Sequence, residues 1–149
     1  MDITVKKEDI VSALNTTLGV VEKRQTLPIL ANVLFEVGEN SFQLTATDLE
    51  SEVTTSSQLT NVESSGKTTT SAKKLNELCR LIPDGEEIKL SLNANKLNIK
   101  TKNGKYSLST LPSADFPVFD IDSGDSPIVI PAKDLRELIM NTSFAMGNQ

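Results

Sequence analysis

The side chains that most often carry out chemistry are few in this chain, and their spacing does not assemble a catalytic site. The sequence has no histidine, so the commonest general base and a common metal ligand are both missing. The one cysteine, Cys79, lies beside Leu78 and one turn from Leu75, which predicts a buried structural thiol. A single cysteine forms no internal disulfide, so a reducing compartment is expected. We predict a protein that is not an enzyme and that needs no cofactor.

Carboxylates at two places have a spacing that could hold a divalent cation. Asp48, Glu50 and Glu52 are spaced by two, so an extended chain would present all three on one side. The aspartates of 120–125 imitate part of a calcium-binding loop but lack its remaining ligand positions. Carboxylates with this spacing lie on solvated strand edges and linkers more often than in metal sites. We therefore predict no metal site. A small metal-dependent hydrolase built on the first trio stays as an alternative.

Basic side chains form two groups that suit binding. Lys73, Glu77 and Arg80 follow the spacing i, i+4, i+7 and would share one outward helix face with a net charge of +1. The simpler interpretation is that Lys73 pairs with Glu77 within that helix. The second group is the lysines of 96–105, a segment without an acidic residue. Lysines on a sheet edge prevent unwanted pairing, and they can equally meet acidic side chains of a partner.

The net charge of −5 hides an uneven distribution. Residues 67–105 hold nine basic and four acidic side chains, a net +5, whereas the rest of the chain holds six basic and sixteen acidic, a net −10. This division suits a body that repels nucleic acid on one surface and tolerates it on another, although scattered surface charge explains it equally well. The chain starts without the apolar segment of a secretory signal, and no apolar run is near the ~18 residues that span a bilayer. We expect a soluble, cytoplasmic protein.

The elements that must position these residues repeat along the chain. Residues 72–78 and 132–138 share the frame Ala-Lys-x-Leu-x-Glu-Leu, sixty residues apart, and a weaker copy lies at 6–14. Each copy follows a short β-prone run and continues with apolar residues at helical spacing. The repeated unit is therefore a strand that enters a helix of about three turns.

Three strand-like stretches follow each complete helix. They lie at about 29–37, 42–47 and 51–58 in the first half, and at 88–92, 97–101 and 106–109 in the second. Pro83-Asp84-Gly85 ends the helix at 73–82, and 61–68 is interpreted as a loop that closes the first half. We predict an α+β fold: two consecutive β-α-β-β-β halves whose two helices pack on antiparallel sheets.

The same pattern predicts the domain organisation. The stretch from Pro112 to Pro127 is rich in Asp, Ser, Gly and Pro, which is typical of a segment that leaves a domain. We expect a first domain at 1–120 and a linker at 121–127. Residues 128–149 would then be the strand and helix that open a second domain, broken off before its later strands.

Five motifs spread over the chain carry a family resemblance. They are TLPIL at 26–30, LTATDLE at 44–50, CR-x-x-P at 79–83, STLP-x-x-DFP at 109–117 and FAM at 144–146. With them the sequence resembles, from end to end, the N-terminal part of the bacterial DNA polymerase III beta subunit, the sliding-clamp family. The resemblance implies the DNA clamp fold and a ring of two identical three-domain subunits around duplex DNA. It also implies a processivity factor that tethers the polymerase during replication and has no catalytic residues.

The resemblance also assigns roles to individual residues. Because helices line the pore of such a ring, the residues facing DNA would be Arg24, Lys73, Arg80, Asn148 and Gln149. The edge where the first domain of one subunit meets the third domain of the other would include Lys74, Lys96, Lys105, Tyr106 and Leu108. The cleft that receives the polymerase and the clamp loader lies in later domains of the family, beyond these residues.

Two places depart from the family pattern. The first helix carries Ser12, Asn15 and Thr16 where a basic pore residue is expected, and Asn103 interrupts the basic series at the subunit edge. A second class of function therefore stays open. It is a stand-alone interaction module that pairs through the Lys96–Leu108 edge with an acidic partner and does not touch DNA.

Overall fold

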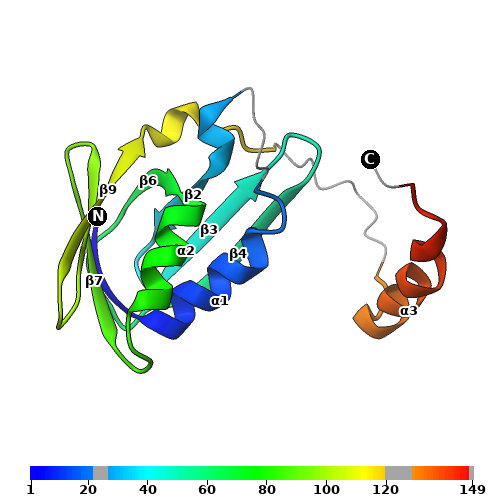
Figure 1. Ribbon diagram of the computed structural model, residues 1–149, viewed down its shortest axis with the longest axis horizontal. Helices are drawn as coiled ribbons and strands as arrows, with labels where there is room; N and C mark the ends of the chain where they lie inside the picture. The colour runs from blue at the N-terminus through cyan, green and yellow to red at the C-terminus, as the bar shows by residue number, and fades with distance from the viewer. Residues whose placement is uncertain (22–26, 120–128, 148–149) are drawn as a thin grey trace. The chain divides into compact units, whose positions relative to one another are not determined.

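The structure is a computed structural model that describes residues 1–21, 27–119 and 129–147. The chain divides into two compact units, Met1–Phe119 and Asp120–Gln149 (Figure 1). No helix in the described ranges is long and apolar enough to cross a membrane.

The described residues of the first unit form one antiparallel sheet of nine strands. The strands are β1 (Asp2–Lys6), β2 (Asn32–Val37), β3 (Ser41–Thr47), β4 (Glu52–Gln58), β5 (Asn61–Ser64), β6 (Gly66–Ser71), β7 (Glu87–Asn93), β8 (Lys96–Lys100) and β9 (Lys105–Leu111). Their order across the sheet is β4-β3-β2-β6-β9-β8-β7-β1-β5. The strands that open the two halves are exchanged: β1 pairs with β7 of the second half, and β6 pairs with β2 of the first. Each half therefore needs the other to complete its part of the sheet.

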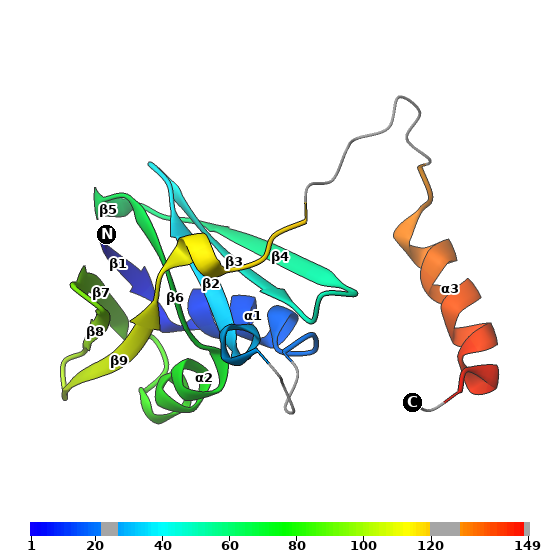
Figure 2. The same ribbon diagram turned by 90° about the horizontal axis from the view of Figure 1, so that it is seen from above.

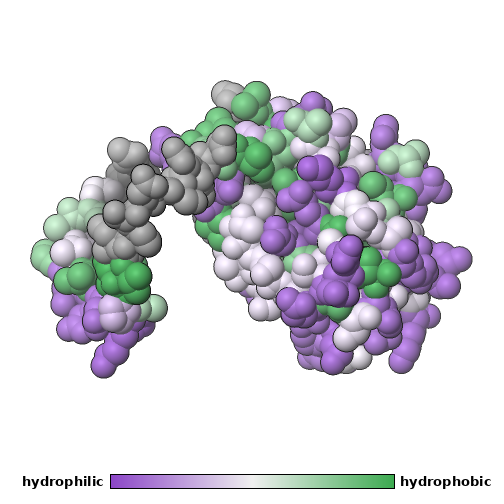
Figure 3. Space-filling model, turned by 180° about the vertical axis from the view of Figure 1, so that it is seen from behind, coloured by the Kyte–Doolittle hydropathy of each residue, from purple (hydrophilic) through white to green (hydrophobic). Residues whose placement is uncertain are grey.

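Two helices, α1 (Lys7–Thr17) and α2 (Ala72–Leu81), cover one face of this sheet and touch each other (Figures 1 and 2). α1 packs on β3 and β4, and α2 packs on β2 and β6. The Ser71 hydroxyl caps α2 by accepting a hydrogen bond from the backbone N–H of Lys74 at 3.4 Å. The opposite face of the sheet, seen in Figure 3, carries mostly hydrophilic and near-neutral residues. The sheet thus has one covered face and one face open to solvent.

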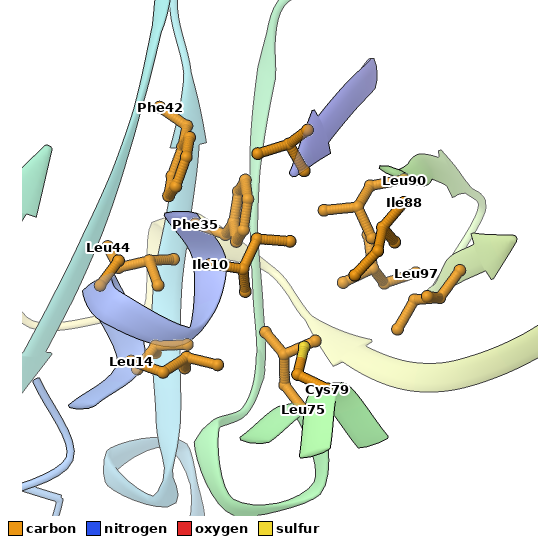
Figure 4. Packing of buried hydrophobic residues seen from close by; sticks show 14 of the residues in the cluster. Ile10, Leu14, Phe35, Phe42, Leu44, Leu75, Cys79, Ile88, Leu90 and Leu97 are labelled. Carbon is orange, nitrogen blue, oxygen red and sulfur yellow. The ribbon is translucent and has the colours of Figure 1, made fainter. Parts of the chain in front are cut away.

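The core lies between the helices and the sheet (Figure 4). Ile10 and Leu14 of α1 and Leu75 of α2 are fully buried in it. Phe35 and Phe42 stack with ring centroids 5.3 Å apart and an interplanar angle of 12°. Burying an apolar side chain of this size contributes about 1.5–3 kcal/mol to the free energy of folding. The apolar sides of α1 and α2 therefore pack against the sheet.

The predicted fold class is confirmed, with two corrections to individual elements. The loop predicted at 61–68 is wrong: residues 61–64 form β5, which pairs with β1 at the edge of the sheet, and β6 begins at Gly66. The strand expected from residue 29 begins only at Asn32, because Pro28 opens a 3-10 helix, η1 (Pro28–Ala31). A second short 3-10 helix, η2 (Ser113–Asp115), follows β9.

The second unit contains the helix α3 (Ala132–Thr142) and a 3-10 turn, η3 (Ser143–Ala145). The strand expected before this helix is not formed at residues 129 and 130. A strand needs a neighbour for its backbone hydrogen bonds, and the described residues of this unit provide none. The apolar side of α3, with Leu135, Leu138 and Ile139, is exposed.

Candidate nucleic-acid interface and strand edge

The basic face predicted on α2 is exposed. Lys73, Lys74 and Arg80 point to solvent, whereas Leu75 is fully buried against the sheet. The predicted pairing within the helix is also present, because Nζ of Lys73 lies 3.9 Å from Oε1 of Glu77. These two side chains are 82% and 62% exposed. A pair so open to solvent contributes little to stability.

Beyond its first turn, the neighbouring helix α1 presents a polar but uncharged surface. Ser12, Asn15 and Thr16 are exposed, and the Thr16 hydroxyl donates a hydrogen bond to the backbone oxygen of Ser12 at 3.1 Å. Both helices expose the side that faces away from the sheet. The positive charge of this surface therefore comes from α2.

Polar contacts hold the start of α1 against the loop that follows α2; this group of residues 7, 8 and 84–86 is called the clasp. Nζ of Lys7 forms an ion pair with Asp84, and a carboxylate oxygen of Glu8 accepts a hydrogen bond from the N–H of Gly85 at 2.6 Å. The backbone N–H of Lys7 donates to the backbone oxygen of Glu86 at 3.0 Å. The hydrogen bond from Lys7 lowers the pKa of Asp84, and the bond from the Gly85 N–H lowers the pKa of Glu8. The clasp thus ties the loop after α2 to the start of α1.

The strand β9 has one open edge. It pairs with β8 from Lys105 to Ser109, but β6 joins its other side only at Thr110 and Leu111. From Lys105 to Leu108, no strand among the described residues pairs with that second side. Unpaired backbone N–H and C=O groups of this kind are a template for pairing with another chain.

The residues predicted for a subunit edge gather around this strand. Tyr106 is 40% exposed, Leu108 is half-buried, and Lys96 lies on β8 opposite Ser109. Lys74, from α2, joins them because it lines the same shallow pocket as Leu108. Lys105 lies at the opposite end of the β8–β9 ladder from Lys96.

Two residues that lie beside this open edge were not predicted from the sequence. Pro28 and Leu111 line the pocket that Lys74 and Leu108 share, and Leu111 is 41% exposed. Both belong to motifs that carry the family resemblance, which was the signal that could have found them. Three of the residues predicted to face DNA, Arg24, Asn148 and Gln149, lie outside the described residues.

Two carboxylates of the first trio, those of Asp48 and Glu52, accept hydrogen bonds from the backbone. Oδ1 of Asp48 accepts hydrogen bonds from the N–H groups of Glu50 at 2.9 Å and Ser51 at 2.6 Å, which lowers the pKa of Asp48. Glu52 accepts a hydrogen bond from the N–H of Phe119 at 2.9 Å. Within the described ranges, no three His, Cys, Asp or Glu side chains come together to hold a metal ion. The aspartates of 120–125 lie outside those ranges.

The cysteine is buried as predicted. Cys79 is completely inaccessible in the core between α2 and the sheet. Burial raises the pKa of its thiol to about 11, so the thiol is protonated near neutral pH. A protonated thiol is a poor nucleophile and a poor metal ligand.

The fold and these surfaces define a duplicated α+β domain of the DNA clamp class, with a basic helix face on one side and an open strand edge at one margin. The family model "DNA polymerase III beta subunit, N-terminal domain" matches residues 1–120. The chain belongs to the DNA polymerase III beta subunit family.

Relatives and solved structures agree with this assignment. The beta sliding clamps of Salmonella typhimurium and Pseudomonas putida are 36% and 38% identical over all 149 residues. The DNA polymerase III subunit beta of Pseudomonas aeruginosa matches with a TM-score of 0.93 at 37% identity, over 100% of this chain and 40% of that one. The pol III beta of Caulobacter crescentus matches with a TM-score of 0.93 at 32% identity, also over 100% of this chain and 40% of that one. The chain spans 41% of the length of these curated relatives.

Proposed function

We propose that this chain forms the first domain, and the opening of the second, of a sliding clamp that encircles duplex DNA and tethers the replicative polymerase. The observation that carries the proposal is the exposed basic face of α2, next to α1 and on the opposite side from the bare sheet face. Lysine and arginine bind phosphates without reading base sequence, which movement along DNA requires. The proposed contacts are Lys73 and Arg80, together with Arg24, Asn148 and Gln149.

The proposed domain boundaries are 1–120 for the first clamp domain, 121–127 for the linker and 128–149 for the start of the second. The separation of the chain into two compact units near residue 120 supports them. So does the repeated sequence frame, because α2 buries its apolar side on strands whereas α3 leaves the matching side exposed. We expect α3 to pack on strands of its own domain in the full-length protein.

The proposed subunit contact is the open edge of β9. A strand from a second subunit would continue the hydrogen-bonded ladder there, and Tyr106 and Leu108 would supply apolar contact area. Lys74, Lys96 and Lys105 favour a partner surface with acidic side chains. The result would be a homodimeric ring.

We propose that polymerase and clamp loader bind to a cleft in later domains of the full-length protein. The place of action would be the cytoplasm, where bacterial DNA is replicated. Neither proposal assigns a catalytic role to the described residues.

The test is topological. The full-length protein that contains this chain is loaded onto nicked circular DNA by a clamp loader and separated from free protein by gel filtration. We expect it to elute with circular DNA and to be lost when a restriction enzyme makes the DNA linear, because a ring slides off a free end. Equal retention on circular and linear DNA would contradict encirclement. Absence of DNA-bound protein, together with binding to an acidic protein partner, would favour the stand-alone interaction module.

A further inference from the structure

A carboxylate lies in the middle of the basic face of α2. Oε1 of Glu77 is 3.9 Å from Nζ of Lys73, one turn before it, and Arg80 follows three residues later. The helix does not depend on this carboxylate, because Ser71 caps its start and Leu75 anchors it in the core. Glu77 is thus an exposed negative charge between the two cations that are proposed to contact DNA.

This position lets Glu77 act on both cations. Side chains three and four residues apart on a helix are neighbours at about 5–6 Å, which is shorter than the Debye length of about 8–10 Å in physiological salt. A phosphate that approaches Lys73 or Arg80 therefore also meets the repulsion of Glu77. The ion pair between Glu77 and Lys73 has a second effect. To bind a phosphate, the ammonium group of Lys73 must either break its contact with the Glu77 carboxylate or divide its charge between the carboxylate and the phosphate.

We infer that Glu77 limits how tightly α2 holds the phosphate backbone, so that each contact breaks easily when the ring advances. The inference rests on the proposed function. The net charge of Lys73, Glu77 and Arg80 is +1, and removal of the carboxylate would raise it to +2. For these three residues, the change doubles the net positive charge without adding a new cation.

The inference is tested on the chain as it stands, by NMR titration with a 20-base-pair duplex at several salt concentrations. We expect Glu77→Gln to bind about threefold more tightly near 0.1 M salt, because one repulsive charge is removed at short range. Lys73 also becomes free to neutralise a phosphate, so the plot of log K against log salt should steepen by up to about 0.9. The backbone amides of α2 should report the binding.

Two variants make the result specific. Glu39→Gln removes the same charge from the exposed turn between β2 and β3. That turn lies at the far end of β2 from the start of α2, about 17 Å away by strand geometry. Glu39→Gln should therefore change the affinity much less than Glu77→Gln. Arg80→Gln removes a proposed phosphate contact and should weaken binding.

The outcomes separate the two proposals. If Arg80→Gln weakens binding while Glu77→Gln behaves like Glu39→Gln, the role of Glu77 is refuted and the DNA-facing role of α2 survives. If Arg80→Gln and Lys73→Gln both leave the affinity unchanged, α2 is not the DNA-binding face and both proposals fail. Thermal unfolding of Glu77→Gln should match that of the unaltered chain, since the exposed pair adds little stability.

Discussion

At the residue scale, burial decides which side chains of α2 can react and which can bind. Cys79 and Lys73 belong to the same helix, yet Cys79 is inaccessible and Lys73 is 82% exposed. The core keeps the thiol protonated, whereas the solvent-facing side presents charged groups at no desolvation cost. One amphipathic helix thereby combines an inert cysteine with a cationic surface.

We predict slow reaction of the Cys79 thiol with an aromatic disulfide reagent at pH 8. In the folded chain, the thiol should react at least ~100-fold more slowly than the same thiol in the unfolded chain. The pKa near 11, against an ordinary value of 9.0, lowers the thiolate fraction by about that factor, and burial adds a steric barrier. The absorbance of the released reagent in buffer and in 8 M urea measures both rates, and Cys79→Ala gives the blank. Fast labelling in buffer would show that α2 opens readily or that the thiol is accessible.

At the element scale, two kinds of contact hold the halves together. The exchanged strands β1 and β6 join them within the sheet, and the clasp joins α1 to the loop that follows α2. The clasp carboxylates have lowered pKa values, so their contribution to stability depends on pH. It is fully present above the pKa values of the unfolded chain and is lost as the pH falls through those of the folded chain.

We predict that the double variant Glu8→Gln, Asp84→Asn is less stable than the unaltered chain at pH 7 and equally stable at strongly acid pH. The unaltered chain should lose this part of its unfolding free energy as the pH falls below about 5, because the two carboxylates become protonated. Urea unfolding followed by circular dichroism at several pH values measures the difference. If the free energies of unfolding of the two chains differed by the same amount at all pH values, the clasp would not couple protonation to folding. Glu39→Gln serves as the control for loss of an exposed carboxylate.

At the scale of the whole molecule, the two open surfaces lie on different parts of the first unit. The basic face belongs to α2, and the open edge belongs to β9; Lys74 is on the first and also lines the pocket of the second. The proposed ring needs this arrangement, because one surface must face the DNA while another joins the next subunit. The proposed assembly can therefore be tested at β9 without changing the DNA-facing residues.

We predict that Leu108→Asp converts the proposed dimer of the full-length protein into monomers at micromolar concentration. A carboxylate in a closed apolar contact, beside a strand ladder that must stay paired, should cost about 2–4 kcal/mol of dimer stability, which is typical of a central interface residue. Analytical ultracentrifugation measures the change in mass. Leu49→Asp, at an exposed leucine in the turn between β3 and β4, should leave the dimer intact. A dimer that tolerates Leu108→Asp would place the subunit contact elsewhere.

The sequence by itself determined the features that depend on local periodicity. Alternation placed six strands and the apolar spacing placed α2 to within one or two residues at most boundaries, because the side chain of each residue faces the core or solvent according to a fixed repeat. The helical periodicity also predicted that Cys79 is buried and that Lys73 and Arg80 share an exposed face. The sixty-residue repeat revealed the two halves, and the motifs revealed the family.

Only the tertiary structure decided which distant segments meet. The exchange of β1 and β6, the pairing of β5 and the open edge of β9 depend on backbone hydrogen bonds between strands far apart in the chain, which no local pattern encodes. The pocket that unites Lys74 with Leu108, and the clasp that uses Lys7 and Asp84, arise for the same reason. Side-chain periodicity specifies the faces of the elements, and packing specifies which faces become neighbours.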